Sequence, residues 1–147
     1  MSSAEAGDAA GRVSGADGAR VRRLAGDPPS PWEQEYSFSR VVAAGGWVFV
    51  GGTTSVDPSG AVIGETPYEQ TVEVLAKLRH ELERAGAGLG DVVSTHVYVT
   101  DISRSDEVGR AHGEVFGEVR PLMTMVEVAA LIDPRMWVEI EAAAFVG

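Results

Sequence analysis

The amino-acid sequence predicts a single α+β domain in which one β-sheet carries two helices on one face. Two segments have the apolar spacing of amphipathic helices, and the segments around them alternate apolar and polar residues as strands do. These elements follow one another as strands, helix, strand, helix and strands, without an internal repeat. A chain of 147 residues, 44% of them hydrophobic, is long enough to bury a substantial core.

The N-terminal part is expected to form a tail, a short strand and a loop. Residues 1–20 are small and polar and lack apolar periodicity, which indicates a disordered tail before a domain over residues 21–147. Val21–Leu24 is a candidate for a short first strand. Three prolines within Asp27–Pro31 predict a loop, because proline lacks the backbone donor that a sheet requires.

A β-hairpin is expected to follow this loop. Phe38–Ala43 and Trp47–Val50 have the composition of strands, and they are joined by Gly45-Gly46. A glycine pair suits the positive φ angles of a tight hairpin turn.

The clearest local signal is the start of the first helix. Thr66 can cap it, Pro67 fits the first helical position, where no donor is needed, and Glu69 occupies the capping-box position. The helix should run to about Ala85, where Gly86 ends it. Its spacing predicts a buried stripe of Val72, Leu75, Leu78, Leu82 and Ala85, with Lys77, Arg79, Glu81 and Arg84 in water.

The C-terminal half is expected to add a strand, a helix and two further strands. Val92–Val99 alternates as a strand does. Ser103 and Asp106 have the spacing of a helix start, and Gly117 marks the end of that helix. The last two strands are expected over Met123–Val128 and Trp137–Phe145.

Composition excludes several classes of protein. The chain has no cysteine, so disulfides and thiolate metal sites are ruled out. Its formal net charge of −10 argues against nucleic acid as a partner, since binding to polyphosphate depends on Lys and Arg. No apolar run reaches the roughly 18 residues that would cross a membrane, and no secretion signal is evident. A cytoplasmic location without membrane contact is expected.

Several motifs together carry a resemblance to a known family. GGWVFVGGTTSVDPSG, the helix beginning YEQTVEVLAKLRHELERAG, the segment HGEVFGEVRP, and the closing stretches RPLMTMVEV and VEIEA occur in an order that resembles the RidA (YjgF) family. The resemblance covers about residues 20–147. It implies a chorismate-mutase-like fold, a homotrimer whose sheets form a central barrel, and sites in the clefts between subunits. A sheet with a second buried face agrees with the apolar strand residues Met123, Met125, Val128, Val138 and Ile140.

The resemblance also implies a small-molecule site. Deaminases of this family hydrolyse reactive imines and enamines to a carbonyl compound and ammonia. They use an arginine that holds the substrate carboxylate and a glutamate that orients the attacking water or moves its proton. The glutamate maps to Glu139, whereas the arginine position is Met123, an aromatic hydroxyl position is Phe38, and an asparagine position is Gly109. A methionine thioether is only a weak acceptor and cannot hold a carboxylate. The expected substrate-binding residues are Phe38, Arg40, Gly52, Met123 and Thr124.

Two further residues could compensate for the missing arginine. Arg40 lies two residues after Phe38, on the same face if the segment is a strand, and His112 lies on the second helix. A cluster of Arg40, His112 and Glu139 could bind an anion and move protons, which makes Glu139 and His112 the catalytic candidates. Alternatively, Arg40 is a solvated or ion-paired strand residue and His112 has a structural role. Glu139 stands in an otherwise apolar strand, where an unpaired carboxylate is costly.

Other sites are not indicated by the sequence. Three scattered histidines without nearby carboxylates make a metal site improbable, and no glycine-rich nucleotide fingerprint or nucleophile elbow is present. No cofactor is therefore expected.

Three functions remain open. The first is an imine or enamine hydrolase of the RidA type, resembling the 2-iminobutanoate/2-iminopropanoate deaminases but with an altered substrate. The second is a hydrolase or lyase acting on a larger, more apolar substrate, which Phe38 and Met123 would favour. The third is a non-catalytic trimer that binds a metabolite or a partner protein.

Overall fold

The computed structural model describes residues 20–147, and the predicted tail lies, except for Arg20, outside the described residues. Its sheet is mixed and has six strands in the order β1-β2-β3-β6-β4-β5. The elements are β1 (Arg22–Leu24), α2 (Pro31–Tyr36), β2 (Val41–Ala44), β3 (Trp47–Thr53), α3 (Pro67–Arg84), η1 (Leu89–Asp91), β4 (Val92–Val99), η2 (Ile102–Arg104), α4 (Ser105–Phe116), β5 (Leu122–Glu127) and β6 (Val138–Phe145).

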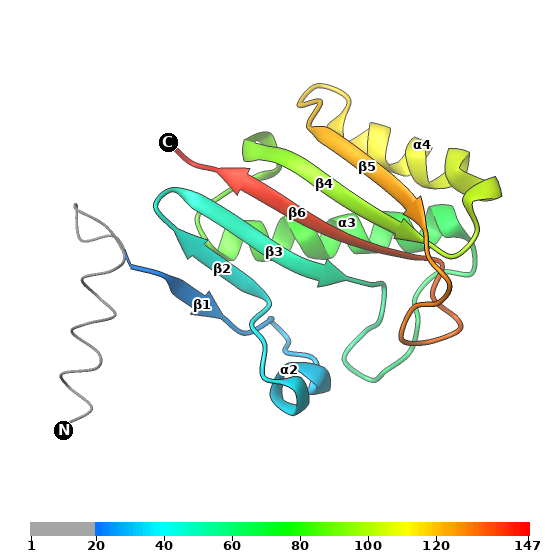
Figure 1. The fold of residues 1–147 in the computed structure, drawn as a ribbon, viewed down its shortest axis with the longest axis horizontal. Helices are drawn as coiled ribbons and strands as arrows, with labels where there is room; N and C mark the ends of the chain where they lie inside the picture. The colour runs from blue at the N-terminus through cyan, green and yellow to red at the C-terminus, as the bar shows by residue number, and fades with distance from the viewer. Residues whose placement is uncertain (1–19) are drawn as a thin grey trace.

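Two helices cover one face of the sheet, as predicted. Figure 1 shows α3 and α4 behind the strands, with the short α2 at the lower edge of the sheet. Strands β4 and β5 are parallel, and the other neighbouring strands are antiparallel. The parallel pair requires a crossover between its two strands, which α4 supplies.

The predicted hairpin is present, but both of its strands have different bounds. Gly45 and Gly46 have φ angles of 56° and 88° and join β2 to β3, as a two-residue turn with positive φ requires. β3 continues to Thr53 through a register shift that follows Val50. β2 begins only at Val41, so the segment from Phe38 to Arg40 leads into the strand and is not part of it.

The short helix α2 was missed by the sequence prediction. Its first residue is Pro31, which completes the predicted proline loop and also fits the first position of a helix. The Glu33 carboxylate accepts the backbone N–H groups of Ser30 at 2.7 Å and Gly26 at 2.8 Å. These bonds fold the loop back over the start of the helix and leave Glu33 buried, at 7% exposure.

Helix α3 begins as predicted, but its buried face differs from the prediction. The Thr66 hydroxyl accepts the Glu69 N–H at 3.1 Å. Val72 is 46% exposed because it lies at the margin of the buried stripe, whereas Glu81 is only 5% exposed. The Glu81 carboxylate pairs with Arg84 at 2.9 Å, which accounts for its burial. The residues of α3 that are buried are Pro67, Gln70, Thr71, Val74, Leu75, Leu78, Glu81 and Leu82.

The second helix starts two residues later than the prediction. Ser103 belongs to η2, whose N-terminus is capped by the Asp101 carboxylate at 3.0 Å from the Ser103 N–H. α4 then runs from Ser105 to Phe116, and Gly117 is its C-cap, as predicted.

The sheet has an apolar second face, but different residues form it. Of the apolar strand residues that suggested a second buried face, Val138 and Ile140 are completely buried and belong to the core. The open face instead carries an aromatic cluster in which the Trp47 and Phe145 rings lie 4.9 Å apart and Phe49 stacks on Trp47. All three side chains are at least 40% exposed.

Candidate functional site

A cavity of about 730 Å³ opens where β2 begins and β3 ends. Its walls come from the loop before α2, from α2 itself, from the segment that follows β3, and from one side of α3. Among its lining residues are Phe38, Arg40, Gly52 and Glu139, four of the residues expected at the site. The fold therefore brings together positions up to 101 residues apart in sequence (38 and 139) in one hollow.

Glu139 is the carboxylate of this cavity whose pKa is raised by burial. It projects from β6 against Gly52 of β3, at a point where a Cβ on residue 52 would overlap its carboxylate oxygen. Burial raises the pKa of the Glu139 carboxyl above its ordinary value, the charge of Arg40 opposes that rise, and the charge of Glu141 adds to it. A carboxyl with a raised pKa is a stronger base than an ordinary carboxylate, which suits it to accept and return a proton.

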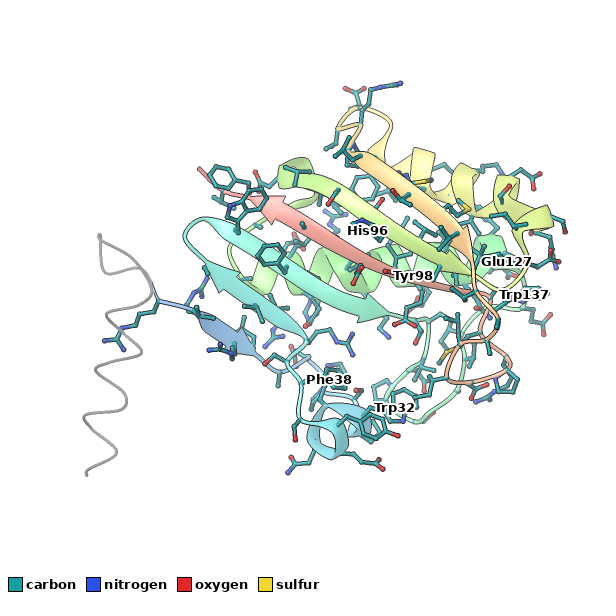
Figure 2. All side chains as sticks on the ribbon, viewed as in Figure 1. Trp32, Phe38, His96, Tyr98, Glu127 and Trp137 are labelled. Carbon is teal, nitrogen blue, oxygen red and sulfur yellow. The ribbon has the colours of Figure 1, made fainter. Side chains whose placement is uncertain are left out.

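The second glutamate of the VEIEA stretch, Glu141, has its partners outside the cavity. Glu141 accepts a hydrogen bond from the Tyr98 hydroxyl at 2.7 Å, and His96 lies 3.8 Å from the same carboxylate. Figure 2 labels His96 and Tyr98 on β4, away from α2. Glu139 is therefore the carboxylate that faces the cavity, and Glu141 belongs to a hydrogen-bonded group on the open face of the sheet.

Arg40 lies in the same cavity as Glu139, and its guanidinium already has two partners within the chain. One guanidinium nitrogen donates to the Gly52 carbonyl, and another lies 3.8 Å from the Glu33 carboxylate. The guanidinium carbon is 5.9 Å from the centre of the Phe38 ring. Phe38 and Arg40 are thus on the same side of the chain, as expected, although a loop and not a strand places them there.

Lys77 is the second cation of the cavity, and the sequence analysis assigned it to the solvated face of its helix. Its ammonium group donates to the backbone carbonyls of Thr54 at 2.6 Å and Val56 at 2.8 Å. Burial lowers the pKa of Lys77, and the nearby charge of Arg40 lowers it further. It is the only lysine in the chain, a compositional signal that could have drawn attention to this position.

Aromatic side chains form the outer wall of the cavity. Trp32 and Tyr36 come from α2, and Phe38 follows them in the chain. Figure 2 shows Trp32 and Phe38 close together at the lower edge of the sheet, beside α2. Tyr36 and Phe38 are 59% and 44% exposed, so these rings are available to a ligand at the mouth of the cavity.

His112 does not join Arg40 and Glu139 within one chain. It is 7% exposed and lies between α4 and the sheet, where its Nε2 is 2.9 Å from the Thr95 hydroxyl and its ring contacts Phe116. Thr95 faces the helices, whereas Tyr98, which pairs with Glu139, faces the opposite side. Burial lowers the pKa of His112, in agreement with the structural alternative for this residue.

Met123 and Thr124 also lie outside the cavity of their own chain. Both belong to β5, which is an edge strand of the sheet, two strands away from β6. Met123 pairs with Thr95 and Thr124 pairs with His96. The expected site residues therefore fall into one group around the cavity and a second group at the β5 edge.

Two classes of site receive no support from the described residues. Within residues 20–147, no group of three or more His, Asp or Glu side chains could hold a metal ion. In the same part of the chain, no helix has the length and apolar character needed to cross a membrane.

The fold is of the chorismate-mutase-like class, and comparison with known proteins identifies the family. A family model described as Endoribonuclease L-PSP matches residues 30–146. A crystal structure of Rv2704 from Mycobacterium tuberculosis, described as a member of the YjgF/YER057c/UK114 family, is 43% identical with a TM-score of 0.78, covering 86% of this chain and 99% of that one. The chain belongs to the RidA (YjgF) family.

Two sequence relatives agree with this assignment. An uncharacterized protein of Streptomyces coelicolor is 40% identical over 128 residues, which is 86% of this chain and 93% of the relative. A RutC family protein of Pyrococcus abyssi is 34% identical over 109 residues, covering 74% of this chain and 85% of the relative.

Proposed function

We propose that this protein hydrolyses imines or enamines to a carbonyl compound and ammonia, with Glu139 as the catalytic residue. The observation that carries the proposal is the position of Glu139, a half-buried carboxylate in a cavity, with a raised pKa and no hydrogen bond within the described residues that would lower it. Its place in the VEIEA stretch matches the catalytic glutamate of the family's deaminases.

The proposed reaction requires little of the site beyond the transfer of a proton. A protonated imine is electrophilic at carbon, and water that attacks it must lose a proton as the new C–O bond forms. Glu139 can take that proton and return it to the nitrogen, so that the C–N bond breaks and ammonia leaves. The balance is one iminium ion and one water converted to one carbonyl compound and one ammonium ion, without any cofactor.

The proposal includes a homotrimer, because one chain carries only part of the expected site. Met123 and Thr124 lie on the β5 edge, away from Glu139, and a neighbouring subunit could place its β5 edge against this cavity. The open sheet face supports association, since Trp47, Phe49 and Phe145 leave an aromatic cluster exposed. The expected partners are thus a small molecule and further copies of the chain.

Hydrolysis of RNA is a less suitable function, despite the description of the matching family model. The net charge is −10, and the cavity is lined by more acidic than basic side chains. Binding of a polyphosphate would require cations that neutralise its phosphates.

The test is release of ammonia from imines generated in place by an amino-acid oxidase or an amine oxidase. We expect hydrolysis faster than in buffer alone, and a loss of roughly 100-fold or more in Glu139→Gln, as for removal of a general base. No acceleration across several imines would exclude the hydrolase. If Glu139→Ala left every activity and ligand affinity unchanged, the non-catalytic binding protein would be the better description.

A further inference from the structure

We propose that the ligand of this cavity is a cationic nitrogen compound with an apolar body and no carboxylate, such as an aryl or alkyl amine or the iminium ion derived from it. The inference rests on the proposed function, because it names the substrate class of the same site. It follows from three features of the cavity: its two cations already have partners within the chain, carboxylates outnumber cations, and one wall is aromatic.

The first feature is that both cations in the described part of the cavity already have partners within the chain. Arg40 donates to the Gly52 carbonyl and lies 3.8 Å from the Glu33 carboxylate, and Lys77 donates to the carbonyls of Thr54 and Val56. Both cations keep further N–H donors, but a substrate carboxylate would have to share Arg40 with the negative charge of Glu33 and Lys77 with two carbonyl oxygens.

The β5 edge does not supply the missing charge. Met123 stands at the position where the family's deaminases have their carboxylate-binding arginine, and Thr124 beside it is neutral. A neighbouring subunit that presents these two side chains adds apolar surface and a hydroxyl group, and no cation.

The second feature is the sign of the electric field inside the cavity. Seven acidic side chains line it, against two cations, Arg40 and Lys77, and the imidazole of His80. Two of the seven, Glu81 and Asp133, are paired with Arg84 and Arg135, which leaves five carboxylates against the two cations. Charges of one sign in a concave site of low dielectric raise the local concentration of oppositely charged ligands. Glu139 on β6 and Glu73 on α3 contribute to this field from different elements.

The third feature is the aromatic wall formed by Trp32, Tyr36 and Phe38. The faces of aromatic rings attract cations, and rings together with carboxylates are the usual surroundings of bound ammonium groups. The same rings can cover the apolar body of the ligand. Carboxylates, rings and committed cations together favour an amine over an amino acid or an imino acid.

The binding test uses three ligands of similar shape, which are phenethylammonium, phenylacetate and the neutral 2-phenylethanol. Isothermal titration of the intact protein should show phenethylammonium binding at least tenfold more tightly than phenylacetate, with the alcohol in between. Equal or tighter binding of phenylacetate, or no binding of any of the three, would overturn the inference.

Matched variants test which carboxylates of the cavity contribute to binding of the ammonium group. Glu139→Gln and Glu73→Gln each remove one carboxylate from the cavity, and we expect Glu139→Gln to weaken phenethylammonium binding by about tenfold, the size of one charge-assisted contact. Glu83→Gln is the control, since Glu83 lies on the exposed side of α3 and pairs with Arg79. An equal loss in Glu83→Gln would contradict a role for the cavity, and thermal melts establish that each variant is folded.

A comparison of two imines separates this inference from the proposed function. One is the imine of acetophenone, made from α-methylbenzylamine by an amine oxidase, and the other is 2-iminopropanoate, made from alanine by an amino-acid oxidase. Faster hydrolysis of the carboxylate-free imine supports both proposals. Faster hydrolysis of 2-iminopropanoate overturns the inference and leaves the hydrolase standing. Binding of phenethylammonium without hydrolysis of either imine would exclude the proposed hydrolase activity and leave the inferred ligand class unaffected.

Discussion

The carboxylate of Glu139 lies against the backbone of Gly52, so closely that a single methyl group on residue 52 would occupy the place of its oxygen. Gly52 lies within the register shift between Val50 and Thr53 of β3, and its carbonyl accepts a hydrogen bond from Arg40. The glycine is therefore needed to leave room for the carboxylate, and it also anchors the cation that faces that carboxylate.

Gly52→Ala should displace the Glu139 carboxylate while leaving the fold intact, because the clash falls on the far end of a flexible side chain. We expect imine hydrolysis to fall by roughly 10- to 100-fold, the cost of misplacing a reacting group by about 1 Å. Gly51→Ala is the matched control, since a Cβ there meets nothing closer than 3.6 Å. Steady-state rates and thermal melts of both variants provide the check, and equal activities would remove Gly52 from the site.

Glu139→Gln should change how stability depends on pH. The pKa of Glu139 is raised by burial above its ordinary value of 4.5, so the folded protein binds this proton more tightly than the unfolded chain does. Stability is therefore lost as pH rises through the interval between 4.5 and the raised pKa. The variant, which has no proton to lose, should show a smaller decrease in urea midpoint over that interval. A decrease as large as that of the native sequence would contradict the raised pKa.

Arg40→Ala should raise the pKa of Glu139 further, because the charge of Arg40 lowers that pKa in the folded protein. If Glu139 acts as a base, the acidic limb of the pH–rate profile should move to higher pH in the variant. Arg79→Ala is the control, since the Arg79 side chain is 63% exposed and pairs with Glu83. An acidic limb that stays in place in Arg40→Ala would contradict this coupling between Arg40 and Glu139.

His112 should make stability sensitive to mild acid. Burial lowers its pKa below the ordinary value of 6.5, so the unfolded chain binds the proton more readily. Stability is then present above pH 6.5 and is lost as pH falls from 6.5 toward the lowered pKa. Denaturation midpoints of His112→Gln should fall less over this range, and His96→Gln, at a side chain that is 52% exposed, should behave as the native protein.

Most helices and strands were predicted from local sequence signals, because the interactions that begin and end them lie within a few residues. The Thr66 cap with Pro67 predicted the start of α3, and Gly45-Gly46 predicted the hairpin; both follow from backbone geometry within a few residues. α2 was missed because its six residues show no apolar period, and because its start depends on Glu33 reaching back to Gly26 and Ser30. The burial of Glu81 was not predicted, because it depends on an ion pair with Arg84 of the same helix. The spacing of apolar residues does not reveal such a pair.

The family resemblance, the sheet with two helices on one face, and a Glu139 without the family's usual arginine can all be recognised in the amino-acid sequence. Which side chains meet depends on the folded chain. The fold places Arg40 beside Glu139 but engages its guanidinium with the Gly52 carbonyl and the Glu33 carboxylate, and it buries His112 against Thr95 on the other face of the sheet. The reason is physical: residue type and spacing fix local geometry, whereas the availability of a charge depends on partners from distant parts of the chain.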